Sequence, residues 1–299
     1  MSSPIQIERD ALDAATILLF DGAALHDHER AMLLHAGAVH ALYDDMNDPQ
    51  ARDAGPLWAW RTSQADSVRT ALWDDPQRVW SVALLHVDSS IQSSEIESRM
   101  ARHFRLLRYV HTHDGQRYFF RFADSRCLQA MHAVLNAAQR SRLFGPVQRW
   151  VFAQRDGQLH ALLPDASPAP AVPSLHLHAK QLSALIDLTW PDQLIASALE
   201  ARPDLDSKTT PAHRHEIGAQ LCSVLRREGI ERYPVQLASL MVVLDAHDGR
   251  STEPQPVLTN ASFIAALKRA EVDGNEQHVL RWADQSSMLL AATLPGSHT

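Results

Sequence analysis

The chain has 299 residues, of which 45% are hydrophobic and 21% are charged. This composition is typical of a globular protein with a buried core, and the length predicts two domains because one domain holds roughly 100 to 200 residues. Acids outnumber bases by 35 to 28, which gives a net charge of −7; nucleic acid is not expected as a partner, since its phosphates would meet no positive field.

Apolar runs and turn residues in the first third of the chain predict strands and helices in alternation. In chain order, the predicted elements are a strand over 15–22, a helix over 29–39, strands over 57–60 and 79–85, and a helix over 93–107. The strand over 79–85 is expected to be central, because its apolar run is the more continuous one. At the start of the helix over 93–107, Ser94 and Glu97 are expected to form a capping box.

The dipeptide Asp114-Gly115 lies between two β-prone segments and predicts a β-hairpin over 110–122. Tyr118, Phe120 and Phe122 are expected to share one face of it, because side chains alternate along a strand. The elements predicted next are a helix over 125–140 and strands over 150–152 and 159–162, joined by a second Asp-Gly turn.

Four prolines within the ten residues 164–173 predict a stiff, extended segment that cannot join a sheet. A boundary is therefore predicted there, with an α/β domain over 1–163, a linker over 164–174 and a helical lobe over 175–299. Periodicity and helix stops predict helices over 179–187, 192–201, 212–227, 234–245 and 262–270. The expected fold class is an α/β N-terminal lobe, with a mixed sheet, helices and hairpins, followed by a mostly α-helical C-terminal lobe.

The sequence shows no pattern for export or membrane insertion. Residues 1–10 lack a basic cluster followed by an apolar run, and no window approaches the roughly 18 consecutive apolar residues that cross a bilayer. Cys127 and Cys222 are the two cysteines, and both lie in helical patterns far apart, which excludes a disulfide framework and fits a reducing compartment. We expect a cytoplasmic protein.

Histidine offers the main candidates for chemistry. Four His-x-His pairs occur, namely His26/His28, His111/His113, His176/His178 and His213/His215. Both members of such a pair point to one side of a strand, as a metal site requires, but no acidic or cysteine residue recurs at a ligand spacing with them. Surface or hairpin histidines are the preferred interpretation, and no metal is expected. The chain also lacks a Gly-x-Ser-x-Gly elbow and a Gly-rich phosphate loop, so no catalytic residue and no cofactor are predicted.

Tryptophan is the second residue type that could mark a functional surface. Seven are present, and several cluster between Trp58 and Trp80. Core packing accounts for most of them, but tryptophans on alternate faces of a strand can leave one ring free to anchor a partner. Trp58, Trp60 and Trp190 are therefore candidate partner-binding residues.

One stretch is organised more tightly than composition requires. It consists of a helix ending in Arg105-Leu106-Leu107, then Asp114-Gly115, then Phe120-Arg121-Phe122 with Asp124, Arg126 and Leu128, and finally Phe144-Gly145-Pro146 and Trp150. This succession resembles the signature of the type VI secretion effector chaperones, an adaptor family long carried as a domain of unknown function. The resemblance extends over about 16–163. The sequence departs from the family at Ala123 and Ser125, near a predicted helix start where serine is well tolerated.

The resemblance implies a cytoplasmic adaptor without catalytic residues. Such a protein binds one cognate secreted effector, near an apolar or PAAR-linked segment, and delivers it to the VgrG spike. The motif itself is predicted to brace the fold, since adaptors of different cargo share it: Arg121 would pair with Asp124 at the strand-to-helix turn, and Gly145-Pro146 would end a helix. Recognition of the cargo is expected in the helical lobe and beside the Pro-rich segment.

Two alternatives stay open at this point. One is a metal-dependent or small-molecule enzyme on the α/β lobe that uses the His-x-His pairs as ligands. The other is a structural subunit that binds the spike without any cargo.

Overall fold

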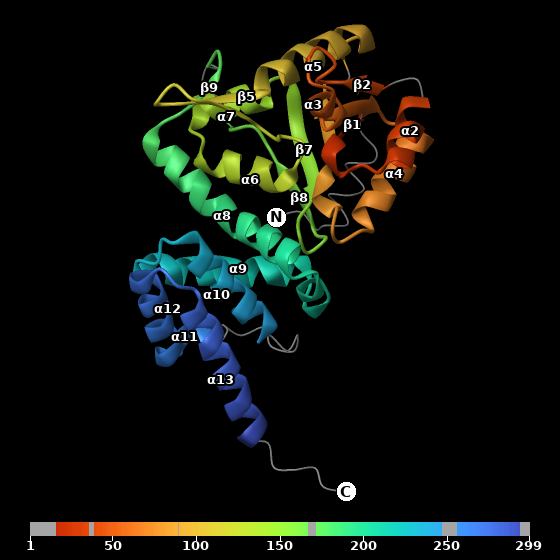
Figure 1. Cartoon of the computed structure of the whole chain (residues 1–299). Helices are drawn as coiled ribbons and strands as arrows, with labels where there is room; N and C mark the ends of the chain where they lie inside the picture. Colours follow the sequence, from red (N-terminus) through yellow and green to blue (C-terminus); the bar gives the residue numbers. More distant parts are fainter. Residues whose placement is uncertain (1–15, 36–38, 89, 167–171, 247–255, 294–299) are drawn as a thin grey trace, which may run out of the picture. The chain divides into compact units, whose positions relative to one another are not determined.

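A six-stranded antiparallel sheet forms the centre of the first half of the chain (Figure 1). Its strands lie in the order β2-β3-β1-β4-β7-β8 and are β1 (Thr16–Phe20), β2 (Val39–Ala41), β3 (Leu57–Trp60), β4 (Val82–Val87), β7 (Val147–Ala153) and β8 (Leu159–Leu162). β4 is central, as predicted, with Leu84 opposite Leu18 of β1 and Val151 of β7. It begins three residues later than the apolar run, because Val79–Ser81 form a 3-10 helix, η2.

The computed structural model describes residues 16–35, 39–88, 90–166, 172–246 and 256–293. Its contacts divide the chain into two compact units, Met1–Leu188 and Thr189–Thr299. The predicted fold class is confirmed, since strands and helices make up the first unit and the described elements of the second are helices. The segment 1–10, which was searched for an export pattern, and residues 167–171 of the predicted linker lie outside the described ranges.

Both faces of the large sheet are covered by helices, which explains why its inner strands are apolar on both sides. On one face, Leu18 and Phe20 pack with Leu33 and Leu72 of the flanking helices. On the opposite face, Leu19 belongs to the larger core of this unit. The helices of the first face are α2 (Asp27–His35) and α4 (Ser63–Trp73); those of the second are α5 (Ser93–Leu107), α6 (Ser125–Val134) and α7 (Ala137–Phe144) (Figure 1).

The helical boundaries differ from the predictions in two places. α5 begins at Ser93 with Gln92 at its N-cap and no side-chain capping bond, so the capping box predicted for Ser94 and Glu97 is wrong. The helix predicted over 125–140 is two helices, because Leu135 is extended and Asn136 caps α7 in a capping box. Two short elements complete the first unit before α4, namely the 3-10 helix η1 (Gly22–Ala24) and α3 (Pro49–Asp53).

A second, three-stranded sheet contains the predicted hairpin. Its strands lie in the order β6-β5-β9 and are β5 (Tyr109–Thr112), β6 (Arg117–Phe119) and β9 (Leu175–Leu177). β5 pairs antiparallel with β6 around the Asp114-Gly115 turn and parallel with β9. β9 was assigned to the helical lobe in the sequence, yet Leu175 and Leu177 are buried in the core of the first unit. The division between the units therefore falls beyond 164–174, inside helix α8 (Ala179–Ala201).

The second unit packs its helices around a separate apolar core. Besides the last part of α8 it contains η3 (Pro203–Lys208), α9 (Pro211–Glu228), α10 (Tyr233–Asp245), α11 (Pro256–Thr259), α12 (Ala261–Asp273) and α13 (Gln277–Thr293). α8 is one helix, although Pro191 was predicted to separate two. An interior proline costs about 3 kcal/mol; burial of Leu194, Ile195 and Ala198 just beyond it in the second core offsets that cost.

Candidate functional site

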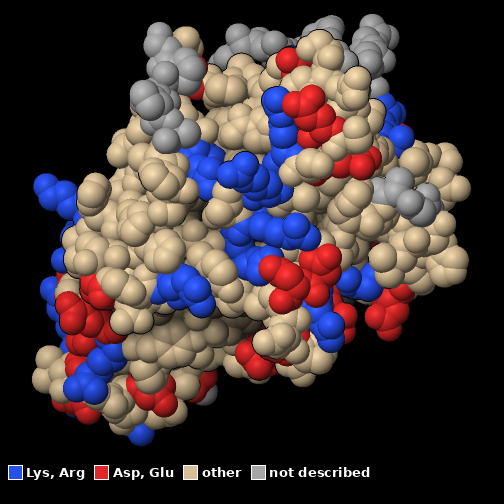
Figure 2. Space-filling model, turned by 90° about the horizontal axis from the view of Figure 1, so that it is seen from above, with Lys and Arg blue, Asp and Glu red and all other residues tan. Residues whose placement is uncertain are grey.

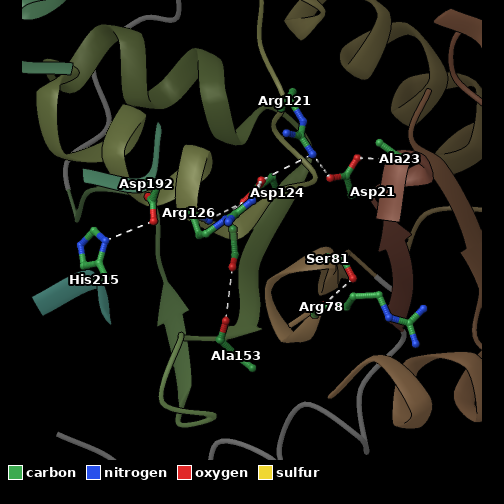
Figure 3. A network of polar contacts seen from close by, with 11 residues as sticks. Asp21, Ala23, Arg78, Ser81, Arg121, Asp124, Arg126, Ala153, Asp192 and His215 are labelled. Carbon is green, nitrogen blue, oxygen red and sulfur yellow. Dashed lines mark hydrogen bonds and ion pairs between the residues drawn. The ribbon is translucent and has the colours of Figure 1, made fainter. Parts of the chain in front are cut away.

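Four charged residues of the first unit meet at the start of α6 (Figure 3). Asp124 is fully buried and caps this helix, accepting a hydrogen bond from the backbone N–H of Arg126 at 3.0 Å. The Arg126 guanidinium donates two further hydrogen bonds to the same carboxylate, at 3.0 and 2.7 Å. Arg121 lies 3.6 Å from Asp124 and 2.5 Å from Asp21. The predicted pair of Arg121 and Asp124 is thus present, but Arg121 has its shorter contact elsewhere.

Asp21 connects this network to the large sheet. It follows the last residue of β1, and its side chain accepts a hydrogen bond from the backbone N–H of Ala23 while its own N–H donates to the Ser81 carbonyl at 2.8 Å. Burial raises the pKa of the Asp21 carboxyl, and the neighbouring Arg121 opposes that rise. The network therefore joins the end of β1, η2 and the start of α6, which is a structural role.

Gly145 shows why the second half of the motif requires these residue types. It ends α7 with φ +51°, a conformation that favours glycine, and a Cβ built on it would overlap the ring of His103. His103 is buried in α5, with its Nε2 atom 3.1 Å from the Leu143 carbonyl oxygen. Burial and the nearby charge of Arg142 lower the pKa of His103 to about 4, so this imidazole is neutral at pH 7. The contact fixes α7 against α5.

The remaining motif residues serve the core or the hairpin turn. Phe104 stacks on Phe122, with ring centroids 5.1 Å apart, and meets the buried Trp150 edge to face at 6.1 Å. Phe120 is buried beside Phe122. Gly115 has φ +81° in the hairpin turn. Pro146 lies between Gly145 and the first residue of β7.

The candidate tryptophans have intramolecular roles in the structure. Trp58 is fully buried and stacks on His40, with ring centroids 4.1 Å apart. Trp60 is half-buried and donates a hydrogen bond from Nε1 to Glu97 at 2.8 Å. Trp190 is half-buried in the second unit and donates from Nε1 to Gln236 at 2.9 Å. None of these three rings is among the exposed large hydrophobic side chains of the described residues.

The structure brings two of the histidine pairs together but assembles no metal-binding group from the described residues. His111 of β5 stacks on His176 of the neighbouring strand β9, with ring centroids 4.9 Å apart. In the second unit, the Nδ1 atom of His215 lies 3.1 Å from Asp192 (Figure 3). No group of three or more His, Cys, Asp or Glu side chains that could hold a metal ion occurs within the described ranges.

An exposed aromatic surface lies on β6, where sequence reasoning had not placed a site. Tyr118 and Phe119 are 55% and 52% exposed on this edge strand. Phe119 contacts Tyr109 of β5, with ring centroids 4.9 Å apart, and the guanidinium of Arg117 lies 4.1 Å from the centre of the same Tyr109 ring. Exposed aromatic rings in one patch are typical of protein interaction sites. Tyr109 and Phe119 lie opposite each other in the pairing of β5 with β6, and we call them the aromatic patch; Tyr118 pairs with Val110 and belongs to the other face of the strand.

The prediction that Tyr118 shares one face with Phe120 and Phe122 was wrong. The run of aromatic residues in which Tyr118 lies was the sequence signal for an exposed ring. β6 ends at Phe119, so the alternation predicted over 118–122 stops there, and Tyr118 is exposed whereas Phe120 and Phe122 are buried. Three aromatic residues in succession, at 118–120, cannot all point to the same side of a strand. At least one ring in such a run must face away from the core.

An open depression runs along α4 and is lined by Ser63, Asp66, Ser67, Thr70, Ala71 and Asp74. These residues come from a single helix and its C-cap, so no second element contributes an opposing group. None of the described helices has the length and apolar character needed to cross a membrane.

A family model matches the part of the chain that holds most of these features. Residues 17–142 match the family described as "Domain of unknown function (DUF4123)". The matched range contains the large sheet from β1 to β4, the hairpin with its aromatic patch, and the polar network of Asp21, Arg121, Asp124 and Arg126. Comparison with curated proteins and with solved structures finds no match.

Proposed function

We propose that this protein is a cytoplasmic adaptor that binds one cognate type VI secretion effector and helps to load it onto the VgrG/PAAR spike. The observation that carries the proposal is the family match over 17–142, together with the motif residues that lie in it and continue to Trp150. The proposal excludes an enzymatic role for the chain. Its partners are the effector, bound through an apolar or PAAR-linked segment, and the spike protein.

The aromatic patch is the surface that suits the effector in this proposal. An extended apolar segment that pairs with the edge of β6 would cover Tyr118 on one face of the strand and Phe119 on the other, and the removal of these rings from water favours binding by roughly 25 cal/mol per Å². β6 is also an edge strand, so its outward backbone groups are available to pair with an extended segment. Both features are on the hairpin that carries the Asp114-Gly115 turn.

Co-expression with the effector encoded by a neighbouring gene tests the proposal. The effector is expected to be soluble and abundant with the wild-type protein and to aggregate or be degraded without it. An effector that is equally soluble alone would contradict the adaptor function. Separate pull-downs on the effector and on the spike protein distinguish an adaptor from a subunit that binds the spike only.

The double variant Tyr118→Ser with Phe119→Ser tests the surface. Because both rings are exposed, the fold should keep its thermal stability, while effector recovery in the pull-down should fall about tenfold or more, as expected for two hot-spot residues. Val272→Ser is the matched control, since Val272 is 81% exposed on α12. Equal recovery with the double variant and the control would place the effector surface elsewhere.

A further inference from the structure

Two arginines of the first unit lie near each other without a carboxylate partner. Arg142 is half-buried on α7, and its Nε and Nη2 atoms are covered but have no hydrogen-bond partner in the described structure. Burial, and then the positive charge of Arg102 on α5, lower the pKa of Arg142. No acidic side chain contributes to that shift. The fold therefore holds a guanidinium partly out of water and beside a second cation.

Several other arginines of the same unit form ion pairs with carboxylates. Carboxylates pair with the half-buried or buried guanidiniums of Arg78, Arg108 and Arg126, at 2.7, 2.6 and 2.7 Å. On α5 itself, Arg99 pairs with Glu95 at 2.5 Å and Arg105 with Asp44 at 3.3 Å. Arg102, which lies between them and is exposed, has no ion pair within the described residues. Two neighbouring guanidiniums such as those of Arg102 and Arg142, without a carboxylate partner, lower the stability of the fold unless an anion binds to them.

The nearest titratable neighbour of this pair, His103, is uncharged at pH 7. His103 follows Arg102 on α5, packs against Gly145 and lies close enough to Arg142 for that charge to lower its pKa. It is neutral at pH 7 and cannot compensate a cation. Figure 2 looks onto the side of the first unit on which α5 lies in Figure 1, and Lys and Arg side chains gather there next to separate groups of Asp and Glu.

We propose that Arg102 and Arg142 form a docking site for an acidic segment of a partner protein. The inference rests on the proposed adaptor function, in which that partner is the cognate effector. Two guanidiniums match one or two carboxylates, which they bind through paired hydrogen bonds. A polyanion such as nucleic acid fits less well, because the net charge of −7 repels it at long range.

Fluorescence anisotropy with the full-length protein tests this site, with a labelled hexaglutamate peptide as the probe at low ionic strength. Wild-type protein should bind hexaglutamate and not hexaglutamine, and the double variant Arg102→Gln with Arg142→Gln should bind about tenfold more weakly or worse, as expected when charged hydrogen bonds are lost. The matched control is Arg99→Gln with Arg105→Gln, which removes the same charge from paired arginines. It should change the affinity less than about twofold.

Three results would overturn the proposal: no binding of hexaglutamate by the wild-type protein, an equal loss in both double variants, or tighter binding of a labelled oligonucleotide than of the peptide. Misfolding is checked by thermal unfolding, in which Arg142→Gln should keep or raise the melting temperature, because it removes an uncompensated charge. Peptide binding needs no effector. A lack of peptide binding would therefore contradict the arginine site without contradicting the adaptor function. An effector that is soluble without this protein would contradict the adaptor function without changing the peptide result.

Discussion

The buried imidazole of His103 makes stability depend on pH. Its pKa is about 4 in the folded protein, against an ordinary value of 6.5, so the unfolded chain binds a proton more readily. The stabilisation is complete above pH 6.5 and is lost progressively as the pH falls towards 4. A difference of this size corresponds to about 3 kcal/mol of unfolding free energy.

Urea denaturation of the wild-type protein and of His103→Gln at pH 7.5 and 4.5 measures this contribution. Wild-type protein should lose about 2 to 3 kcal/mol more than the variant between these pH values, since glutamine does not titrate. Other titrating groups are common to both proteins and cancel in the difference. Parallel losses in the two proteins would show that His103 titrates normally in the fold.

At Asp124, one carboxylate both caps a helix and neutralises Arg126. Asp124→Ala removes the acceptor for the backbone N–H of Arg126 and the carboxylate that pairs with its guanidinium, so it should lower the unfolding free energy by about 2 to 4 kcal/mol. Asp124→Asn keeps a capping oxygen and should cost less. Chemical denaturation of both variants tests the order, and a larger loss for asparagine would contradict the capping role.

Of the contacts that the motif residues make, only those between residues close in sequence were predictable. Arg121 and Asp124 are three residues apart, so their pairing follows from sequence. Asp21 lies 100 positions from Arg121, and only the β1–β4 pairing and η2 bring it near. The paired state of Arg126 and the unpaired state of Arg142 likewise depend on neighbours that a single sequence does not reveal.

At the level of elements, the turn after α7 is predicted to tolerate no side chain. Gly145→Ala should lower the unfolding free energy by about 2 to 4 kcal/mol, because a Cβ would add strain at φ +51° and collide with His103. Gly115→Ala is the matched control. It also has positive φ, at +81°, but a Cβ there meets no atom within 4 Å, so the cost should be about 1 kcal/mol.

Thermal and urea unfolding of the two glycine variants separate backbone strain from steric overlap. Similar costs at both positions would mean that the His103 ring moves aside freely and does not fix α7. A larger cost at Gly145 would instead identify the α5–α7 contact as a rigid part of the fold.

Element types were more predictable than element ends. The apolar face of α5 was enough to predict a helix there, but its N-cap is Gln92 and not Ser94. The position of a cap depends on the path of the preceding loop, which the sequence pattern does not give. In the stretch 125–140, the apolar stripe continues past Leu135 although the helix does not, since Asn136 and Gln139 cap a new one. Pro191 shows the opposite case, in which packing keeps a helix intact through a proline.

Over the whole molecule, the position of β9 decides where the first unit ends. A fragment of residues 1–188 contains this strand, whereas a fragment of residues 1–163, ending at the predicted boundary, lacks it. The shorter fragment loses Leu175 and Leu177 from the core and should be less stable by about 3 to 6 kcal/mol. Circular dichroism melting of the two purified fragments compares them, and equal melting temperatures would show that β9 is dispensable.

The domain boundary predicted at the prolines of 164–173 differs from the division of the two units, which falls between Leu188 and Thr189. Composition alone does not tell whether the chain returns to the same core after such a segment. β9 has only three residues, Leu175–Leu177. A run this short does not show enough alternation of apolar and polar residues to be recognised as a strand. Gln139 of α7 adds a hydrogen bond to the His176 carbonyl, a contact that sequence patterns do not encode.

The parallel pairing of β5 with β9 also affects how the protein is made. β5 and β6 can form their hairpin as soon as residue 119 has been synthesised, whereas the other edge of β5 stays unpaired until residue 177 follows. During that interval the nascent chain exposes a strand edge together with the aromatic side chains of the hairpin. Slow translation of the proline codons of 164–173 would lengthen the time for which this edge of β5 is unpaired. During that time misassembly competes with folding.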